Sequence, residues 1–492
     1  IGAGDEGPAP CEGANPDVGE VIPCSVGRGL GEQSEQRGAS TNPSLHDFSG
    51  SLWVFGFRHL GHPRDGSSKG FDSGTEAAYG SLLRMRVQRV GIQMIVTVII
   101  LLGLGLGWVV ACIWLSQRHP EPLWDWATID TSDRSFPKGF LWGSATAAHQ
   151  VDGGNTNNNW ARWEQSVDES GRPRVHNGDS AGSACEHWER YAEDIRRMRE
   201  DLGLRSYRFS IEWSRVEPEP GQFDAGAIDH YHAMIDAIID AGMEPMITLH
   251  HFTNPLWFED MGGFEPEENI AHFVAFSRRM FEEYGSKVER WCTINECGPY
   301  AVMGYGLGVF PPGVKNLQRM AVVLYHLMRA HTAVYDAIKA MPGGERAQVG
   351  LVKNIFQFDP YRRWNLFHWA LCRFADAAYN QSILGYLQTG RFRIVLPGFV
   401  RVDEHHPGDA LKSDFVGLNY YANLILSIFM KREPPFEPHA RPGQVLTDMP
   451  YAIYAEGFYR ALMRLKPLNK PVIVTENGIA DDRDDRRALW IE

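Results

Sequence analysis

The sequence predicts an α/β protein built around a barrel of parallel strands, and two stretches carry this prediction. The run VIVTENG (Val472 to Gly478) is apolar and mostly β-branched, and it ends abruptly at Glu476. The run ERWCTINE (Glu289 to Glu296) repeats this pattern and ends at Asn295 and Glu296. Strands that are apolar on both faces are typical of a parallel sheet covered by helices. We therefore expect each run to be a buried strand with a glutamate at its carboxyl end.

Helical patterns alternate with further apolar runs along the C-terminal three-quarters of the chain. Strands are expected at residues 141–145, 206–211, 246–252, 289–296, 348–354, 414–421 and 472–478. Helices are expected at residues 186–202, 229–241, 317–341 and 364–387. This alternation predicts a (β/α)8 TIM barrel that lacks its eighth strand. Such a barrel would expose the edges of its first and seventh strands.

The two glutamates are expected to face one pocket. All strand carboxyl ends of such a barrel open onto the same face, so Glu296 and Glu476 can converge although they lie far apart in the sequence. Cleavage of a glycosidic bond requires a pair of carboxyl groups with different roles. The alternative is that each glutamate simply ends a strand and is solvated, and for either residue alone this simpler interpretation is favoured.

From about Phe136 to the last residue, the chain resembles glycoside hydrolase family 1, the retaining enzymes of β-glucosidase type. The T-x-NE motif at Thr293 and the TENG motif at Thr475, in this order, carry the resemblance. The resemblance implies hydrolysis of terminal β-D-glucosyl or related β-glycosyl residues through a covalent glycosyl-enzyme intermediate. It makes Glu476 the nucleophile and Glu296 the acid/base, with no metal and no organic cofactor.

The resemblance also implies roles for residues around the two glutamates. Arg208 and Tyr421 would orient the nucleophile, and an arginine inside a barrel is costly unless a carboxylate pairs with it. The residues expected to contact the substrate are Gln150, His251, Asn295, Asn419 and Tyr421. The chain departs from the family pattern at Asp152, Phe252, Cys297 and Gly298, where the family usually has glutamate, tryptophan, proline and an aromatic residue.

The ends of the chain suggest that it is incomplete. It opens on Ile1 rather than methionine, and it stops at Glu492 within a predicted helix. In the family, the eighth strand and its loop carry a tryptophan and a Glu-Trp pair that close the glycone pocket, and this sequence has no counterpart of them. The identity of the sugar therefore stays open, and an inactive fragment or a carbohydrate-binding remnant is one alternative function.

The N-terminal part of the chain differs from the predicted barrel in composition. Residues 1–84 are rich in glycine, proline and serine without a sustained period, so we expect them to be disordered, or untranslated if Met85 is the initiator. Residues 85–118 are predicted to form a signal-anchor transmembrane helix, residues 119–135 a linker, and residues 136–492 the incomplete barrel.

The predicted membrane span covers residues 90–115, a run of 26 residues without a charge. A bilayer core requires roughly 20 residues, whereas a cleaved signal peptide, the alternative, has an apolar core of about 7–15 residues. Arginines precede the span and acidic residues follow it, so the positive-inside rule places the barrel on the non-cytoplasmic side. The anchor also motivates an alternative activity, transfer of sugars among glycolipids at the membrane.

The composition argues against nucleic-acid binding and against some kinds of structural site. The formal net charge is −13 and no basic run stands out in the C-terminal three-quarters, which argues against nucleic acid as a partner. The seven cysteines are scattered without metal-ligand spacing, so we expect neither a disulfide framework nor a structural zinc ion. The expected partners are a small β-glycoside or oligosaccharide and, through residues 90–115, a membrane.

Overall fold

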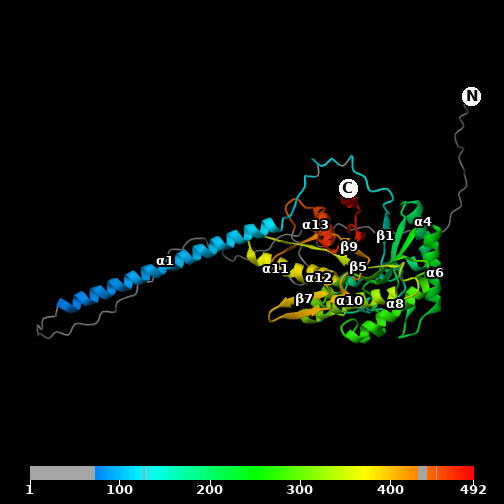
Figure 1. Cartoon of the computed structure of the whole chain (residues 1–492), viewed down its shortest axis with the longest axis horizontal. Helices are drawn as coiled ribbons and strands as arrows, with labels where there is room; N and C mark the ends of the chain where they lie inside the picture. Colours follow the sequence, from blue (N-terminus) through cyan, green and yellow to red (C-terminus); the bar gives the residue numbers. More distant parts are fainter. Residues whose placement is uncertain (1–72, 126–127, 131, 430–439, 450, 492) are drawn as a thin grey trace, which may run out of the picture. The chain divides into compact units, whose positions relative to one another are not determined.

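The computed structural model describes residues 73–125, 128–130, 132–429, 440–449 and 451–491 (Figure 1). The chain divides into two compact units, residues 1–84 and residues 85–492. The predicted disorder of residues 1–72 lies outside the described part of the chain. Residues 73–84, which we also expected to be disordered, are instead helical, because helix α1 (Ser73–Arg118) begins well before the apolar run.

Helix α1 contains the predicted membrane span. Residues Ala77–Arg118 are long and apolar enough to cross a bilayer, and their most apolar window is only 6% buried. A buried core helix would meet the same length and composition criterion, but it would not expose its aliphatic side chains in this way. The exposure of residues such as Ile99, Leu102 and Leu106 therefore separates α1 from the helices that cover the barrel.

Seven parallel strands form the barrel, and the prediction of a TIM barrel with seven strands is confirmed. Their spatial order follows the sequence: β1 (Gly143–Ala145), β2 (Ser206–Ser210), β3 (Glu244–His250), β4 (Arg290–Asn295), β5 (Gln348–Asn354), β9 (Phe415–Tyr420) and β11 (Val472–Asn477). Each neighbouring pair is parallel. The sheet is open between β1 and β11, where the described residues supply no further strand.

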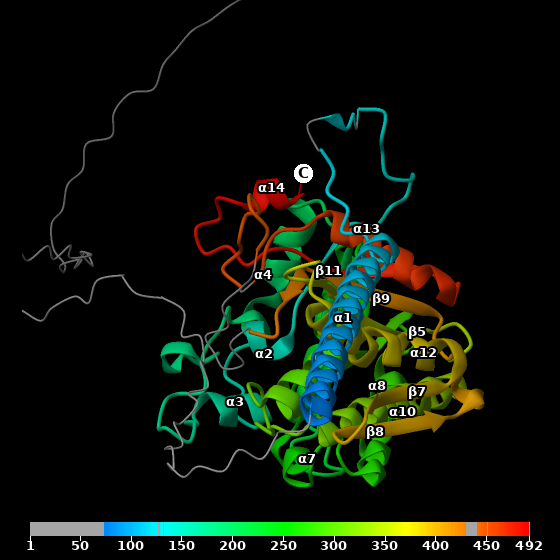
Figure 2. The ribbon, with the colours of Figure 1, turned by 90° about the vertical axis from the view of Figure 1, so that its left-hand side faces the viewer.

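Helices cover the outside of the barrel, as Figures 1 and 2 show. The longer ones are α4 (His187–Glu200), α6 (Ala225–Asp240), α8 (Ile270–Tyr284), α10 (Leu317–Lys339), α11 (Leu366–Asp376), α12 (Ser382–Thr389) and α13 (Glu456–Leu465). The short ones are α2 (Ala148–Val151), α3 (Asn159–Glu164), α5 (Trp213–Val216), α7 (Leu256–Asp260), α9 (Cys297–Ala301) and α14 (Arg487–Ile491). Two π-helical segments, η4 (Val302–Leu307) and η5 (Ala377–Gln381), continue α9 and α11.

The core has two parts because successive strand residues face opposite sides of the sheet. In β4, Trp291 faces outward into the large apolar layer between sheet and helices, whereas Cys292 belongs to a small cluster inside the barrel. Met246, Val352 and Phe415 complete the inner cluster. The inner cluster is small, so the barrel interior is filled by apolar residues at one level and by polar side chains at the strand carboxyl ends.

Some elements escaped the sequence prediction. Strands β7 (Arg391–Leu396) and β8 (Val400–His405) form an antiparallel hairpin that lies against α10 and α12 (Figure 2). Strands β6 (Gln357–Pro360) and β10 (Asn423–Leu426) form a separate parallel pair. The helix expected at residues 364–387 is divided into α11, η5 and α12.

The seventh barrel strand is less buried than its composition predicted. We expected VIVTENG to be covered on both faces, but Val474 is 42% exposed. The reason is its place at the edge of the sheet, since β11 pairs only with β9 within the described residues. Its carboxyl end is nevertheless held in register with β9, which positions the residues discussed next.

Candidate active site

The two predicted glutamates follow irregular strand ends. The β4–β5 register shifts between Cys292 and Asn295, and the β11–β9 register shifts between Val474 and Glu476. Such bulges turn a side chain out of the regular alternation, and they are frequent next to active sites. Glu296 itself has a φ of 50°, in the left-handed region, and its backbone nitrogen donates to the Val352 carbonyl at 3.0 Å.

Glu476 is held by a cation and a hydroxyl. Arg208 Nη1 lies 2.7 Å from one carboxylate oxygen, and the Tyr421 hydroxyl donates to the other at 2.7 Å. Burial opposes ionisation of this carboxyl, but Arg208 and Tyr421 more than offset burial and hold the pKa of Glu476 below its usual value. Glu476 is therefore a carboxylate at neutral pH.

Arg208 also donates hydrogen bonds to other side chains of the site. It is 3% exposed, and it donates through Nε to Thr248 at 2.9 Å and through Nη2 to the Asn295 side-chain oxygen at 2.8 Å. The Asn295 amide in turn lies 3.1 Å from Nε2 of His251. Burial lowers the pKa of His251 to about 3, so this ring is neutral at neutral pH and contributes position rather than charge, although it lies 4.0 Å from Glu476.

Glu296 has a different environment. No cation lies within 4 Å of its carboxyl group among the described residues, and two amides donate to Oε1, Asn419 at 2.7 Å and Asn354 at 3.1 Å. Burial, together with the negative charge of Glu476, raises the pKa of Glu296 to about 7. One carboxyl group is thus ionised at neutral pH while its neighbour retains its proton over much of the neutral range, which suits a nucleophile paired with a general acid.

The structure brings seven of the eight predicted site residues together. Arg208, His251, Asn295, Glu296, Asn419, Tyr421 and Glu476 form one hydrogen-bonded or ionic network. Gln150 stands apart: it is exposed on α2, and its side chain makes no hydrogen bond with another described residue.

Four residues of the network were not predicted as site residues: Thr248, which accepts from Arg208, and the three described next. Asn354 ends a predicted strand and binds Glu296, and Thr475 donates to the Asn419 side-chain oxygen at 2.6 Å. Tyr379 donates to Asn354 at 3.0 Å. The position of Asn354 at a barrel-strand carboxyl end was the one available signal, because the chain around Tyr379 gave only a helical pattern.

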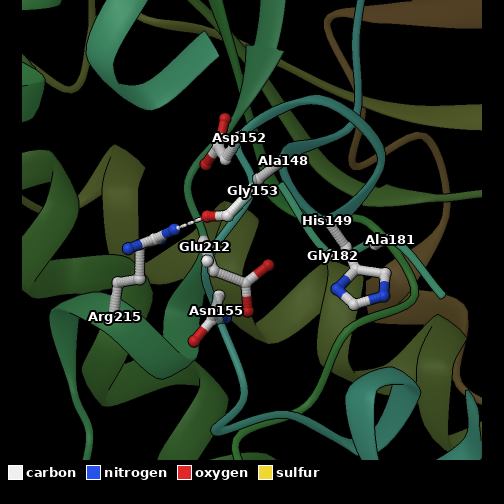
Figure 3. A pocket seen from close by; sticks show the side chains of 10 residues that line it. Ala148, His149, Asp152, Gly153, Asn155, Ala181, Gly182, Glu212 and Arg215 are labelled. Carbon is white, nitrogen blue, oxygen red and sulfur yellow. Dashed lines mark hydrogen bonds between the residues drawn. The ribbon is translucent and has the colours of Figure 1, made fainter. Parts of the chain in front are cut away.

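A separate small cavity lies beside α2, and neither Glu296 nor Glu476 lines it (Figure 3). It measures about 10 Å³, and its polar lining includes Asp152, Glu212 and Arg215. Arg215 donates to the Gly153 carbonyl, while one carboxylate oxygen of Asp152 is buried without a hydrogen-bond partner in the described chain. Burial raises the pKa of Asp152 to about 8. Asp152 is the residue that stands where the family usually has glutamate.

Comparison with known proteins agrees with the sequence motifs and the fold. The profile described as glycosyl hydrolase family 1 matches residues 132–489. β-Glucosidase A of Thermotoga maritima is 31% identical over 369 residues, covering 71% of this chain and 79% of the relative. β-Glucosidase A of Acetivibrio thermocellus is also 31% identical over 369 residues, covering 70% of this chain and 79% of the relative.

Solved structures give the same result. The β-glycosidase of Pyrococcus horikoshii has a TM-score of 0.62 and 34% identity, covering 72% of this chain and 79% of that protein. A Thermotoga maritima β-glucosidase in complex with castanospermine has a TM-score of 0.62 and 28% identity, covering 72% of this chain and 83% of that protein. With the profile match over most of the chain, these similarities show that the chain belongs to glycosyl hydrolase family 1 and is a glycoside hydrolase of β-glucosidase type.

Proposed function

We propose that this chain hydrolyses terminal β-D-glucosyl or related β-glycosyl residues with retention, through a covalent glycosyl-enzyme intermediate on Glu476. The observation that carries the proposal is the opposite electrostatic environment of the two carboxyl groups. Arg208 and Tyr421 favour the charged form of Glu476, and burial beside that charge favours the protonated form of Glu296. Retaining cleavage requires this division of protonation states.

In the first step, a Glu476 oxygen attacks the anomeric carbon while the bond from that carbon to the leaving oxygen breaks. Glu296 gives its proton to the leaving oxygen, so the alcohol departs neutral and Glu476 becomes a glycosyl ester. Esterification removes the negative charge of Glu476. Because that charge is one cause of the raised pKa of Glu296, its loss favours ionised Glu296 for the second step.

In the second step, Glu296 takes a proton from water while the water oxygen bonds to the anomeric carbon. The ester bond to Glu476 breaks, and Glu476 is again a carboxylate held by Arg208 and Tyr421. His251 lies 4.0 Å from Glu476 and contacts Asn295, and this supports roles for both residues in binding sugar hydroxyls. These groups bind and orient the substrate, and proton transfer is left to Glu296.

The test is labelling of the full chain with an activated 2-deoxy-2-fluoro-glucoside, because the fluorine slows breakdown of the glycosyl ester. Peptide mapping should find the sugar on Glu476 and on no residue in the Glu476→Gln variant. Labelling of another acid, or a product of inverted configuration, would contradict the mechanism. Binding of glucosides without turnover would favour a carbohydrate-binding role instead.

The exposed apolar helix α1 supports a further part of the proposal, a single membrane span, and the arginines before it and acidic residues after it favour the barrel on the non-cytoplasmic side. It also favours one second candidate activity, in which a glycolipid hydroxyl replaces water in the second step. Protease added to sealed vesicles should reach the barrel, and protection until the vesicles are opened would reverse the orientation. Product analysis with a lipid acceptor present separates transfer from hydrolysis.

A further inference from the structure

A buried lysine lies directly behind the acid/base carboxyl. Lys353 is the penultimate residue of β5. Its side chain points away from the barrel interior, and the residue is 0% exposed. Among the described residues, no carboxylate oxygen lies within 4 Å of its amino group. A buried ammonium without an ion pair is costly, so its retention calls for an explanation.

The amino group of Lys353 is held by two contacts. It donates to the backbone carbonyl of Asn354, and it lies over the ring of Tyr379, 4.1 Å from the ring centroid. A cation over an aromatic face is an electrostatic attraction that strengthens when the pair is desolvated. Both contacts are with residues of the network around Glu296.

Tyr379 links this lysine to the acid/base. Its hydroxyl donates to the Asn354 side-chain oxygen at 3.0 Å, and the Asn354 amide nitrogen donates to Glu296 at 3.1 Å. Gly298 makes room for the tyrosine, because a Cβ at this position would lie 2.9 Å from the ring. Gly298 stands where many members of the family have an aromatic residue, and Tyr379 fills the space that its missing side chain leaves.

The charged and titratable groups around Lys353 come from several elements. Burial lowers the pKa of Lys353 to about 7, while Glu296, Cys297 and Asp376 favour its charged form and Arg464 opposes it. Asp376 is already paired with Arg464. Burial raises the pKa of Cys297 to about 12, so this thiol is uncharged at neutral pH. Glu296 is therefore the acidic group whose charge acts most strongly on Lys353, and Lys353 in turn favours the ionised form of Glu296.

We propose that Lys353 is a positioning residue for the acid/base: it clamps Tyr379 and Asn354 against Glu296 and supplies a positive charge that favours the ionised carboxylate. The inference rests on the proposed function of Glu296. The first step requires protonated Glu296 and the second requires ionised Glu296. Burial still opposes ionisation of Glu296 after Glu476 has been esterified, and a nearby cation offsets part of that cost in the second step.

The experiment compares Lys353→Met with Lys353→Arg in the full chain. Lys339→Met is the control, because Lys339 also lies over a tyrosine ring and donates to a backbone carbonyl, at Ala347, beside the amino end of β5. Unlike Lys353, it is partly exposed and also pairs with Asp414 at 2.7 Å. The two lysines are roughly 20 Å apart by the rise of the strand. Because the charged form of Lys353 favours ionised Glu296, Lys353→Met should move the alkaline limb of kcat/KM for cellobiose to higher pH, by less than a full pH unit because the amino group is only partly charged near its pKa of about 7.

Lys353→Arg keeps the positive charge, so it should not move that limb to higher pH, and Lys339→Met should leave the limb in place. A uniform loss of activity in Lys353→Met, without movement of the limb, would overturn the proposal, because it would show a structural role only. Should the methionine variant fail to fold, Lys353→Gln gives the same neutralisation and keeps a donor toward Asn354.

A readout without turnover separates this inference from the proposed function. Protonated carboxyls react with a carbodiimide, so labelling of Glu296 against pH, measured by peptide mass, follows its ionisation directly. The midpoint should be higher in Lys353→Met than in the unsubstituted chain. A chain that hydrolyses no β-glycoside but shows this shift would refute the proposed function alone, and unchanged midpoints would refute the role of Lys353.

Discussion

Replacement of Glu296 by alanine tests the acid/base directly. The change removes a carboxyl group that accepts from Asn419 at 2.7 Å and Asn354 at 3.1 Å, and it leaves a small space lined by these two amides. Positioned general acid catalysis contributes about 10²–10⁴-fold. The full loss of kcat/KM should appear only with substrates whose leaving group has to be protonated.

Alkyl glucosides and cellobiose have poor leaving groups, so Glu296→Ala should lower kcat/KM for them by about 10²–10⁴-fold. A nitrophenyl glucoside needs little protonation, so its first step should be nearly spared and the second step should become limiting. The alkaline limb of the pH profile, set by a group whose pKa is about 7, should disappear with the residue.

Added azide supplies the test of the second step. A small anion can enter the space left by the carboxyl and attack the glycosyl ester without base assistance, so turnover of the nitrophenyl glucoside should recover, with a β-glycosyl azide as product. Glu265→Ala, which breaks an ion pair with Arg319 on the surface, is the control and should change neither rate. Equal losses on good and poor leaving groups, without azide rescue, would refute the assignment of Glu296.

Two further predictions concern pH. Tyr421→Phe removes the 2.7 Å hydrogen bond to Glu476, and hydrogen bonds to charged groups contribute about 1.5–3 kcal/mol. The acidic limb of kcat/KM should therefore move to higher pH, and turnover should fall by roughly 10-fold. An acidic limb at an unchanged pH would contradict the role of the hydroxyl. The pKa of Asp152 is about 8 in the folded chain against 3.8 in its unperturbed state, so the folded state binds the extra proton and loses stability as pH rises between these values. Asp152→Asn should therefore leave stability nearly unchanged at pH 4 and increase it by a few kcal/mol at pH 8, measured by urea denaturation, and a pH-independent difference would show that Asp152 does not titrate in this range.

The sequence could locate the catalytic pair because its signal is local. Strand patterns that end in Glu296 and Glu476 need only the general geometry of a parallel barrel to bring the two carboxyl ends to one face. The cost of an unpaired arginine inside a barrel likewise predicted a carboxylate partner for Arg208, and Glu476 is that partner.

What the sequence could not give depends on packing across elements. The contact between Lys353 and Tyr379 joins a strand to a π-helical segment, and neither residue carries a local pattern that indicates the other. The exposure of Val474 has the same origin, because an edge strand and a central strand share one composition and differ only in their neighbours. The β7–β8 hairpin lies between the predicted helix at residues 364–387 and the predicted strand at residues 414–421, in a stretch for which we predicted no element.

The left-handed backbone of Glu296 has a consequence for how this site can change over generations. With a φ of 50°, the residue that aims its carboxyl at the neighbouring acid also destabilises the fold by about 1 kcal/mol relative to a glycine there, which adopts such angles freely. A glycine at this position would relieve the backbone strain, but it would also leave the Asn419 and Asn354 amides without their acceptor. The strained backbone itself is therefore a feature that selection on folding would not maintain, and its persistence depends on selection for activity.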